Sequence, residues 1–136
     1  MSNLKAIPGR TRKLSVLVVD DEEAIREVAT KILEMGGYKV ITANDGTEAL
    51  GEFVQHQQEI RLVITDILMP YMDGIALIRS LRQIEPSVTI IAASGQEADA
   101  EFLTTAGIKV EKFLPKPFTA ETLLSAIYSV LHKTQT

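Results

Sequence analysis

The sequence of 136 residues contains no cysteine and no tryptophan, and aromatic residues make up only 5% of it. Without cysteine, the chain can form no disulfide bond, no cysteinyl zinc site and no thiol nucleophile. No apolar run approaches the roughly 20 residues that a membrane-spanning helix needs, and the sequence does not open with a signal-peptide pattern. We therefore expect a cytoplasmic protein without a membrane partner.

Charged residues make up 24% of the chain and are unevenly distributed. Residues 1–13 hold four basic and no acidic residues, whereas the remainder holds ten basic and eighteen acidic ones. Because an acidic domain attracts a phosphate backbone only weakly, we expect no direct binding to nucleic acid. The pattern predicts a flexible basic leader over 1–13, one domain over 14–133 and a short C-terminal tail over 134–136. An arm for nucleic acid or anionic membranes is the alternative interpretation of the leader.

Short segments, most of them rich in β-branched residues, alternate with segments of helical period. The predicted strands are Leu14–Val19, Tyr38–Thr42, Arg61–Thr65, Val88–Ala92 and Val110–Leu114. The helical segments carry apolar stripes that include Val28 and Leu33, Phe53 and Val54, Leu77 and Leu81, Phe102 and Leu103, and Leu123 and Ile127. Asp73 and Thr119 are expected to cap the third and the last of these helices. The alternation predicts an α/β domain of (βα)5 type, a doubly wound open sheet of parallel strands with helices on both faces.

Polar side chains follow four of the predicted strands. Asp20 and Asp21 follow the first strand, Asp66 the third, Ser94 the fourth and Lys116 the fifth. Because the carboxyl ends of parallel strands share one edge of the sheet, where doubly wound folds bind ligands, we expect these side chains to converge. Clustered carboxylates offer only oxygen ligands, so they favour a hard divalent cation, Mg²⁺ above all, with Mn²⁺ as a substitute.

The loop after the first strand, residues 20–23, lacks the glycines that cradle phosphate in nucleotide- and flavin-binding proteins of this architecture. We therefore expect neither FMN nor NAD. The pocket instead favours phosphoryl transfer to a carboxylate, with Asp66 as an anionic nucleophile. Mg²⁺ and Lys116 would neutralise the phosphoryl oxygens, and Ser94 would donate a hydrogen bond to one of them. The acyl phosphate would add negative charge and act as a switch.

Four short motifs stand at these strand ends, Val18–Glu22, Asp66–Gly74, Ala93–Gly95 and Lys116–Phe118. Taken together and in this order, they resemble the receiver domain of two-component response regulators over roughly residues 14–132. The resemblance implies a flavodoxin-like fold with strand order 2-1-3-4-5. It also implies a signalling phosphoacceptor rather than an enzyme with external substrates, and a monomer or a weak phosphorylation-dependent dimer.

The resemblance further implies roles for the acidic residues. Asp66 would take a phosphoryl group from a phosphohistidine on a sensor histidine kinase or a histidine phosphotransfer protein. Mg²⁺ would be held by Asp20, Asp21, Asp66 and the backbone carbonyl of Leu68.

The resemblance implies that the remaining site residues contact the phosphoryl group or respond to it. Ser94 and Lys116 would contact it, with a cis peptide bond between Lys116 and Pro117. Ser94 would move toward the phosphate, and the ring of Phe113, at the aromatic switch position, would turn inward. The surface of the fourth helix, fifth strand and fifth helix would then change for a downstream effector.

Two questions stay open at this point. The chain fits either a stand-alone response regulator or the C-terminal receiver of a hybrid histidine kinase. The alternative function is a Mg²⁺-dependent phosphohydrolase with an aspartyl-phosphate intermediate. That function usually requires an Asp-x-Asp motif, and Leu68 stands where the second aspartate would be.

Overall fold

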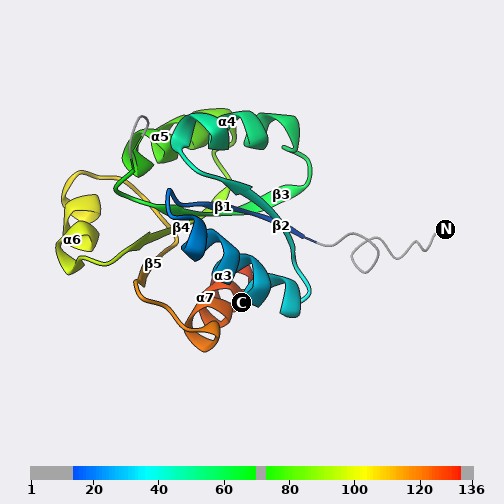
Figure 1. Ribbon diagram of the computed structural model, residues 1–136. Helices are drawn as coiled ribbons and strands as arrows, with labels where there is room; N and C mark the ends of the chain where they lie inside the picture. Colours follow the sequence, from blue (N-terminus) through cyan, green and yellow to red (C-terminus); the bar gives the residue numbers. More distant parts are fainter. Residues whose placement is uncertain (1–13, 70–72, 133–136) are drawn as a thin grey trace.

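The computed structural model describes residues 14–69 and 73–132. Within them, five parallel strands form one sheet in the order β2-β1-β3-β4-β5, and five helices pack against it (Figure 1). The elements are β1 (Ser15–Val19), α3 (Glu23–Met35), β2 (Lys39–Ala43), α4 (Gly46–Gln55), β3 (Ile60–Asp66), α5 (Gly74–Ile84), β4 (Thr89–Ser94), α6 (Glu97–Thr105), β5 (Lys112–Pro115) and α7 (Ala120–His132). The predicted α/β class and strand order are confirmed. The predicted leader over 1–13 and tail over 134–136 lie outside the described residues.

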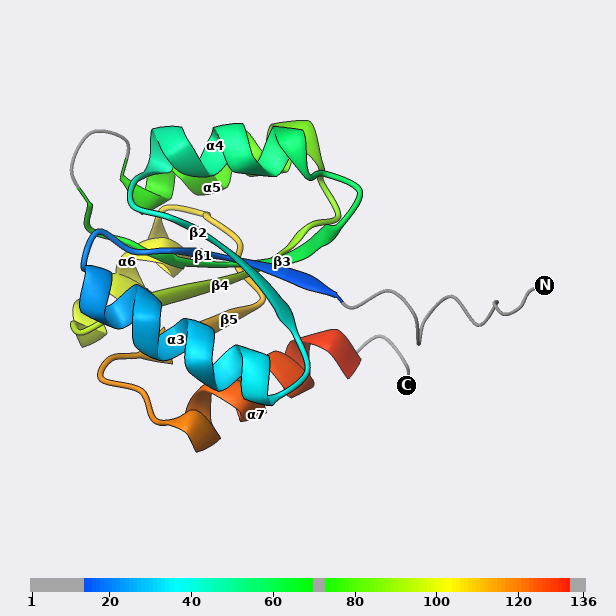
Figure 2. The same ribbon diagram turned by 45° about the vertical axis from the view of Figure 1, so that its right-hand side comes forward.

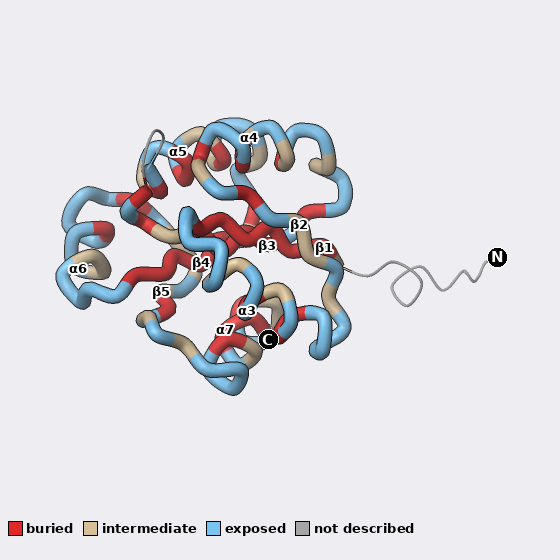
Figure 3. The backbone as a smooth tube through the Cα atoms, viewed as in Figure 1, coloured by how far each residue is buried: buried red, intermediate tan, exposed pale blue. Residues whose placement is uncertain are grey.

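Helices cover both faces of the sheet (Figure 2). α3 and α7 lie on one face, and α4, α5 and α6 lie on the other. Because strand side chains alternate in direction, each face has its own hydrophobic core, with Leu17 and Ile90 on the α4 side and Val16 and Ile91 on the α3 side. β1, β3 and β4 are buried on both faces (Figure 3), as their apolar sequences predict.

Some large side chains of the predicted apolar stripes are exposed. Val28, Val54 and Phe102 expose 49%, 57% and 55% of their surface. A helix on a sheet buries only the side chains that point directly at the strands, and the helical period does not fix how wide that buried face is. In α6, Leu103 is the residue that the helix buries.

The strand ends differ from the prediction by one or two residues, which matters for the site. β3 extends to Asp66 and β4 to Ser94, so the backbones of both residues are held within the sheet rather than in the following loops. β5 begins at Lys112 instead of Val110 and ends at Pro115, which lies opposite Ser94 in the sheet register.

Two predicted helix caps are confirmed. Asp73 accepts a hydrogen bond from the backbone N–H of Ala76 at 2.9 Å where α5 begins. Thr119 Oγ1 accepts one from the backbone N–H of Thr122 at 3.1 Å at the start of α7. None of the helices within the described ranges is long and apolar enough to span a membrane.

Candidate functional site

Asp20 is the most deeply buried of the three predicted acidic ligands, with 3% of its surface exposed. Its Oδ1 accepts a hydrogen bond from the backbone N–H of Glu22 at 2.9 Å, and its Oδ2 accepts one from Lys116 Nζ at 2.8 Å. Its backbone carbonyl accepts a further hydrogen bond from Arg26 Nη1 at 2.7 Å. Both carboxylate oxygens are therefore paired, as the burial of a charge requires.

Lys116 links two strand ends from the loop after β5. Its Nζ lies 2.8 Å from Asp20 Oδ2 and 3.5 Å from Asp66 Oδ1. The peptide bond between Lys116 and Pro117 is cis, as the resemblance implies. Burial by itself lowers the pKa of Lys116, but the hydrogen bond and charge of Asp20, with the charge of Asp66, outweigh it and raise the pKa above its ordinary value. The ammonium group is therefore charged at neutral pH.

Asp66 is the last residue of β3, and 12% of its side chain is exposed. Its Oδ1 accepts a hydrogen bond from the backbone N–H of Ile67 at 3.0 Å. Burial raises the pKa of Asp66 to about 6, with the charge of Lys116 opposing the rise and the charge of Asp20 adding to it. Since this pKa lies below neutral pH, Asp66 is still mostly ionised there.

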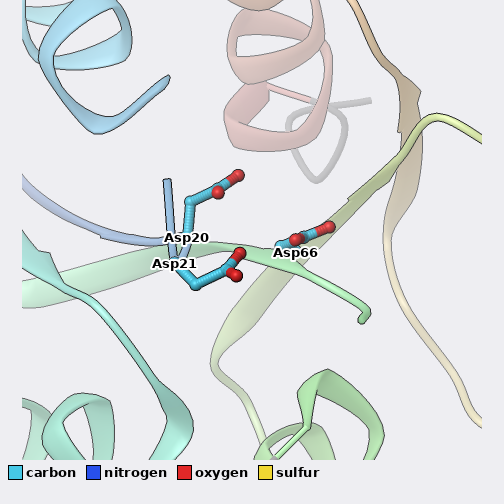
Figure 4. A group of neighbouring side chains, drawn as sticks. All are labelled: Asp20, Asp21 and Asp66. Carbon is cyan, nitrogen blue, oxygen red and sulfur yellow. The ribbon is translucent and has the colours of Figure 1, made fainter. Parts of the chain in front are cut away.

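Asp21 joins the other two acids in one cluster (Figure 4). Unlike them, it is exposed. One carboxylate oxygen from each of Asp20, Asp21 and Asp66 lies within 4.8 Å of the others. Three oxygens at this spacing can reach a single small divalent cation, and oxygen-only ligands favour Mg²⁺ or Mn²⁺ over softer metals. The donor set therefore fits the predicted metal.

Ser94 ends β4 beside this cluster and is 4% exposed. Its Oγ accepts a hydrogen bond from the backbone N–H of Gln96 at 3.1 Å and donates one to the carboxylate of Asp99. Both hydrogen bonds of this hydroxyl group are therefore made with the start of α6.

The other two predicted site residues are Leu68 and Phe113. Leu68 stands two residues beyond Asp66 and exposes 60% of its surface. Phe113, in β5, is half-buried and packs against the core on the α4 side of the sheet. It lines a groove between α6 and β5 together with Leu103 and Ile108. Its ring therefore lies next to α6 rather than in the acidic cluster.

Comparison with known proteins identifies the family. A family model described as the response regulator receiver domain matches residues 16–128. The chain belongs to the response regulator receiver family. Receiver domains are signalling phosphoacceptors that bind Mg²⁺ at an acidic site, and this receiver brings three aspartates together at the corresponding edge of its sheet.

Individual relatives agree with this assignment. The response regulator MprA of Mycobacterium leprae is 35% identical over 122 residues, which cover 90% of this receiver and 53% of MprA. The sensor kinase CckA of Brucella abortus is 36% identical over 119 residues, 88% of this receiver and 13% of CckA. The crystal structure of the CheX–CheY–BeF3–Mg²⁺ complex from Borrelia burgdorferi contains a chain that matches with a TM-score of 0.81 and 29% identity, covering 90% of this receiver and 92% of that chain. The receiver thus spans about half the length of MprA and a small part of CckA.

In the metal-free receiver, we expect the contribution of Asp66 to the free energy of unfolding to fall as the pH rises from 3.8 through about 6, because folding raises the pKa of this carboxyl group across that range. Below this pH range, Asp66 is protonated in both the folded and the unfolded chain, so its contribution to the stability of the fold is at its maximum. As the pH rises, the unfolded chain releases its proton first and gains stability relative to the folded one. The shift corresponds to about 3 kcal/mol at most. Urea unfolding in EDTA at a series of pH values measures it.

The Asp66→Asn variant provides the control for this pH dependence. Asparagine has nearly the same shape but does not titrate, so the difference in unfolding free energy between wild type and variant isolates the contribution of this one carboxyl group. The same pH slope in both proteins would contradict the assignment of the shifted pKa to Asp66.

Sequence reasoning missed the contributions of three residues to the site. Arg26 holds the backbone of Asp20, and Asp99 holds the hydroxyl group of Ser94. Gly74 lies so close to Asp66 that a side chain would collide with its carbonyl oxygen. The position of Gly74 directly after Asp73, the cap of a predicted helix, was a signal that could have indicated its contribution. No sequence signal indicated the contacts made by the side chains of Arg26 and Asp99.

Proposed function

We propose that this receiver takes a phosphoryl group from a phosphohistidine onto Asp66 and passes the signal on through a change in its surface. The position of Lys116 carries the proposal, since its ammonium group lies between the carboxylates of Asp20 and Asp66 where three acids cluster. Among the described residues, Lys116 is the cation that pairs with these carboxylates, and Arg26 binds the backbone of Asp20. Three carboxylates still leave the pocket negative, so it repels a phosphoryl group unless a divalent cation is also present. Such a charge balance suits a metal-dependent phosphoacceptor.

The proposed transfer uses the ionised form of Asp66. One carboxylate oxygen attacks the phosphorus atom, and a P–O bond forms while the P–N bond to the histidine breaks. The imidazole nitrogen keeps the electron pair of the broken bond and takes up a proton. Because Asp66 is mostly ionised at neutral pH, it needs no general base. Lys116 donates a hydrogen bond to a phosphoryl oxygen and neutralises part of its charge.

The acidic cluster would hold the metal ion. Asp20, Asp21 and Asp66, together with the backbone carbonyl of Leu68, are the ligands we propose for Mg²⁺, with Mn²⁺ as a substitute. When bound, the cation supplies neutralisation of charge on the phosphoryl oxygens. The hydrogen bond from the backbone N–H of Glu22 to the side chain of Asp20 keeps this ligand oriented.

Ser94 and Phe113 would pass the change on. Ser94 ends β4, and Phe113 lies on the adjacent strand β5 opposite Ala92. If the hydroxyl group of Ser94 moves toward the phosphoryl group, the ring of Phe113 can turn inward from the groove beside α6. The altered surface of α6, β5 and α7 would then be recognised by a downstream effector protein.

The relatives of this receiver are of two kinds, response regulators and sensor kinases. MprA is a response regulator and CckA is a sensor kinase, so receivers with this degree of similarity occur in both kinds of protein. In either setting, we propose a sensor histidine kinase or a histidine phosphotransfer protein as the phosphoryl donor. The receiver would act as a monomer or a weak phosphorylation-dependent dimer.

Incubation of the intact chain with acetyl phosphate and Mg²⁺ tests the proposal. We expect one phosphoryl group per chain, stable in acid, released by base and absent when EDTA replaces Mg²⁺, because an acyl phosphate on a single carboxylate has this chemistry. Intact-protein mass spectrometry measures the adduct. Absence of an adduct would contradict the proposal. Continuous hydrolysis of p-nitrophenyl phosphate would instead favour the phosphohydrolase.

A further inference from the structure

The hydroxyl group of Ser94 is bound on two sides by the start of α6. Its Oγ accepts a hydrogen bond from the backbone N–H of Gln96 at 3.1 Å and donates its proton to the carboxylate of Asp99. Gln96 is the N-cap of α6, and Asp99 lies in the first turn. Since Ser94 is 4% exposed, water has little access to replace either partner.

A serine hydroxyl group has only one proton to donate. In the structure, that proton goes to Asp99. Under the proposed function, an oxygen of the phosphoryl group on Asp66 requires the same proton, because a phosphoryl oxygen is an acceptor only. The two acceptors therefore compete, and Ser94 can donate to the phosphoryl group only after it leaves Asp99.

We propose that Asp99 is a positioning residue that holds Ser94 away from the phosphoryl group and thereby opposes phosphorylation of Asp66. The inference rests on the proposed function, since the competition exists only if Asp66 is phosphorylated. A hydrogen bond to a charged acceptor is stronger than one between neutral groups. Asp99 thus determines how readily Ser94 responds to the phosphoryl group.

Release of Ser94 also changes the first turn of α6. The side chain of Gln96 makes no cap hydrogen bond, and its backbone N–H depends on Ser94 Oγ. When Ser94 leaves, this N–H loses its acceptor and the Asp99 carboxylate loses its donor. An acid at the third helical position that accepts from the N-cap N–H is the arrangement of a capping box, so the two groups can pair with each other. The release therefore connects the acidic cluster to α6, which lies beside Phe113.

Replacement of Asp99 with alanine tests the inference. The probe is beryllium trifluoride, a phosphoryl mimic, titrated in the presence of Mg²⁺ into the full chain and followed by NMR. We expect Asp99→Ala to bind it about tenfold more tightly than wild type, because the hydrogen bond that competes for Ser94 is gone. Asp99→Asn, whose side-chain oxygen still accepts a hydrogen bond, should show a smaller gain.

The amide resonance of Gln96 gives a readout that is independent of binding. Its N–H donates to Ser94 Oγ, so its chemical shift reports the position of the hydroxyl group. In unliganded Asp99→Ala, we expect this resonance to move from its wild-type position toward its position in wild type saturated with beryllium trifluoride. An unchanged resonance would show that Asp99 does not hold Ser94, and would overturn the inference.

Two further variants separate the hydrogen bond from the charge. Glu97→Ala removes an exposed carboxylate from the same first turn, and the two hydrogen bonds of Ser94 do not involve that residue. It should leave the affinity unchanged. In a Ser94→Ala background, Asp99→Ala should bring no gain. An equal gain from Glu97→Ala, or a gain that persists without the Ser94 hydroxyl group, would overturn the inference.

The proposed function can fail separately from this inference. If wild type binds no beryllium trifluoride with Mg²⁺ and forms no adduct with acetyl phosphate, the proposed function is wrong and the inference is wrong with it. If wild type binds the probe and Asp99→Ala binds it no more tightly, only the inference is overturned.

Discussion

Replacing Asp66 with asparagine reduces the labelling of the chain by acetyl phosphate and Mg²⁺ to background, a loss of several orders of magnitude expected when a nucleophile is removed. An amide oxygen carries no full negative charge, so it cannot form the P–O bond at a useful rate. We expect no transfer to Asp20, because 5% of its side chain is exposed against 12% for Asp66, and Lys116 lies closer to it. Mass spectrometry of the intact chain after labelling measures the result.

Asp45→Asn is the matched control for this substitution. Asp45 caps α4 by accepting a hydrogen bond from the backbone N–H of Glu48 at 2.8 Å, and asparagine caps a helix equally well. This variant makes the same chemical change outside the acidic cluster, so it should be labelled like wild type. Wild-type labelling of Asp66→Asn would show that another residue accepts the phosphoryl group.

Replacing Gly74 with alanine destabilises the receiver by about 3 kcal/mol or more. A Cβ atom at this position would lie 2.2 Å from the carbonyl oxygen of Asp66 and 2.7 Å from the Cα atom of Ile67. Both are backbone atoms at the end of β3, so neither can rotate away as a flexible side chain would. The start of α5 must then move away from the site, and phosphorylation should slow as well. Urea unfolding measures the stability, and labelling with acetyl phosphate measures the second effect.

Gly51→Ala is the comparison that isolates the collision. Gly51 lies in α4 and is exposed, and a Cβ atom added to it would meet no neighbouring group within 4 Å. Alanine favours the helix over glycine there, so this variant should be more stable than wild type by about 1 kcal/mol. A loss of stability at Gly51 equal to that at Gly74 would contradict the steric explanation.

Most of the acidic site was predictable because it depends on local patterns. Asp20, Asp66 and Lys116 each follow a predicted strand, and parallel strands bring their carboxyl ends to one edge. The hydrophobic period predicted less well where strands end and which helix residues are buried. The structure extends β3 to include Asp66 and leaves Phe102 exposed, because strand pairing and the width of a packed helix face depend on neighbours that the local sequence does not specify.

Side-chain partners and pKa values were beyond local reasoning. Whether Ser94 donates to Asp99 depends on how α6 is oriented at the end of β4, and no spacing rule encodes that orientation. The raised pKa of Asp66 likewise arises first from burial, then from the opposing charge of Lys116. Burial at this position results from the packing of several elements together.

The sequence by itself determined the α/β class and the residue types that gather at one edge of the sheet, because periodicity and motif spacing record local geometry. The strand order was implied by the resemblance of its motifs to the receiver family. The tertiary structure decided which of these groups touch. Lys116 and Asp20 are 96 residues apart in the sequence, yet Lys116 Nζ lies 2.8 Å from Asp20 Oδ2. A hydrogen bond needs its two atoms placed within a few tenths of an ångström, and only the packing of the whole domain sets distances that finely.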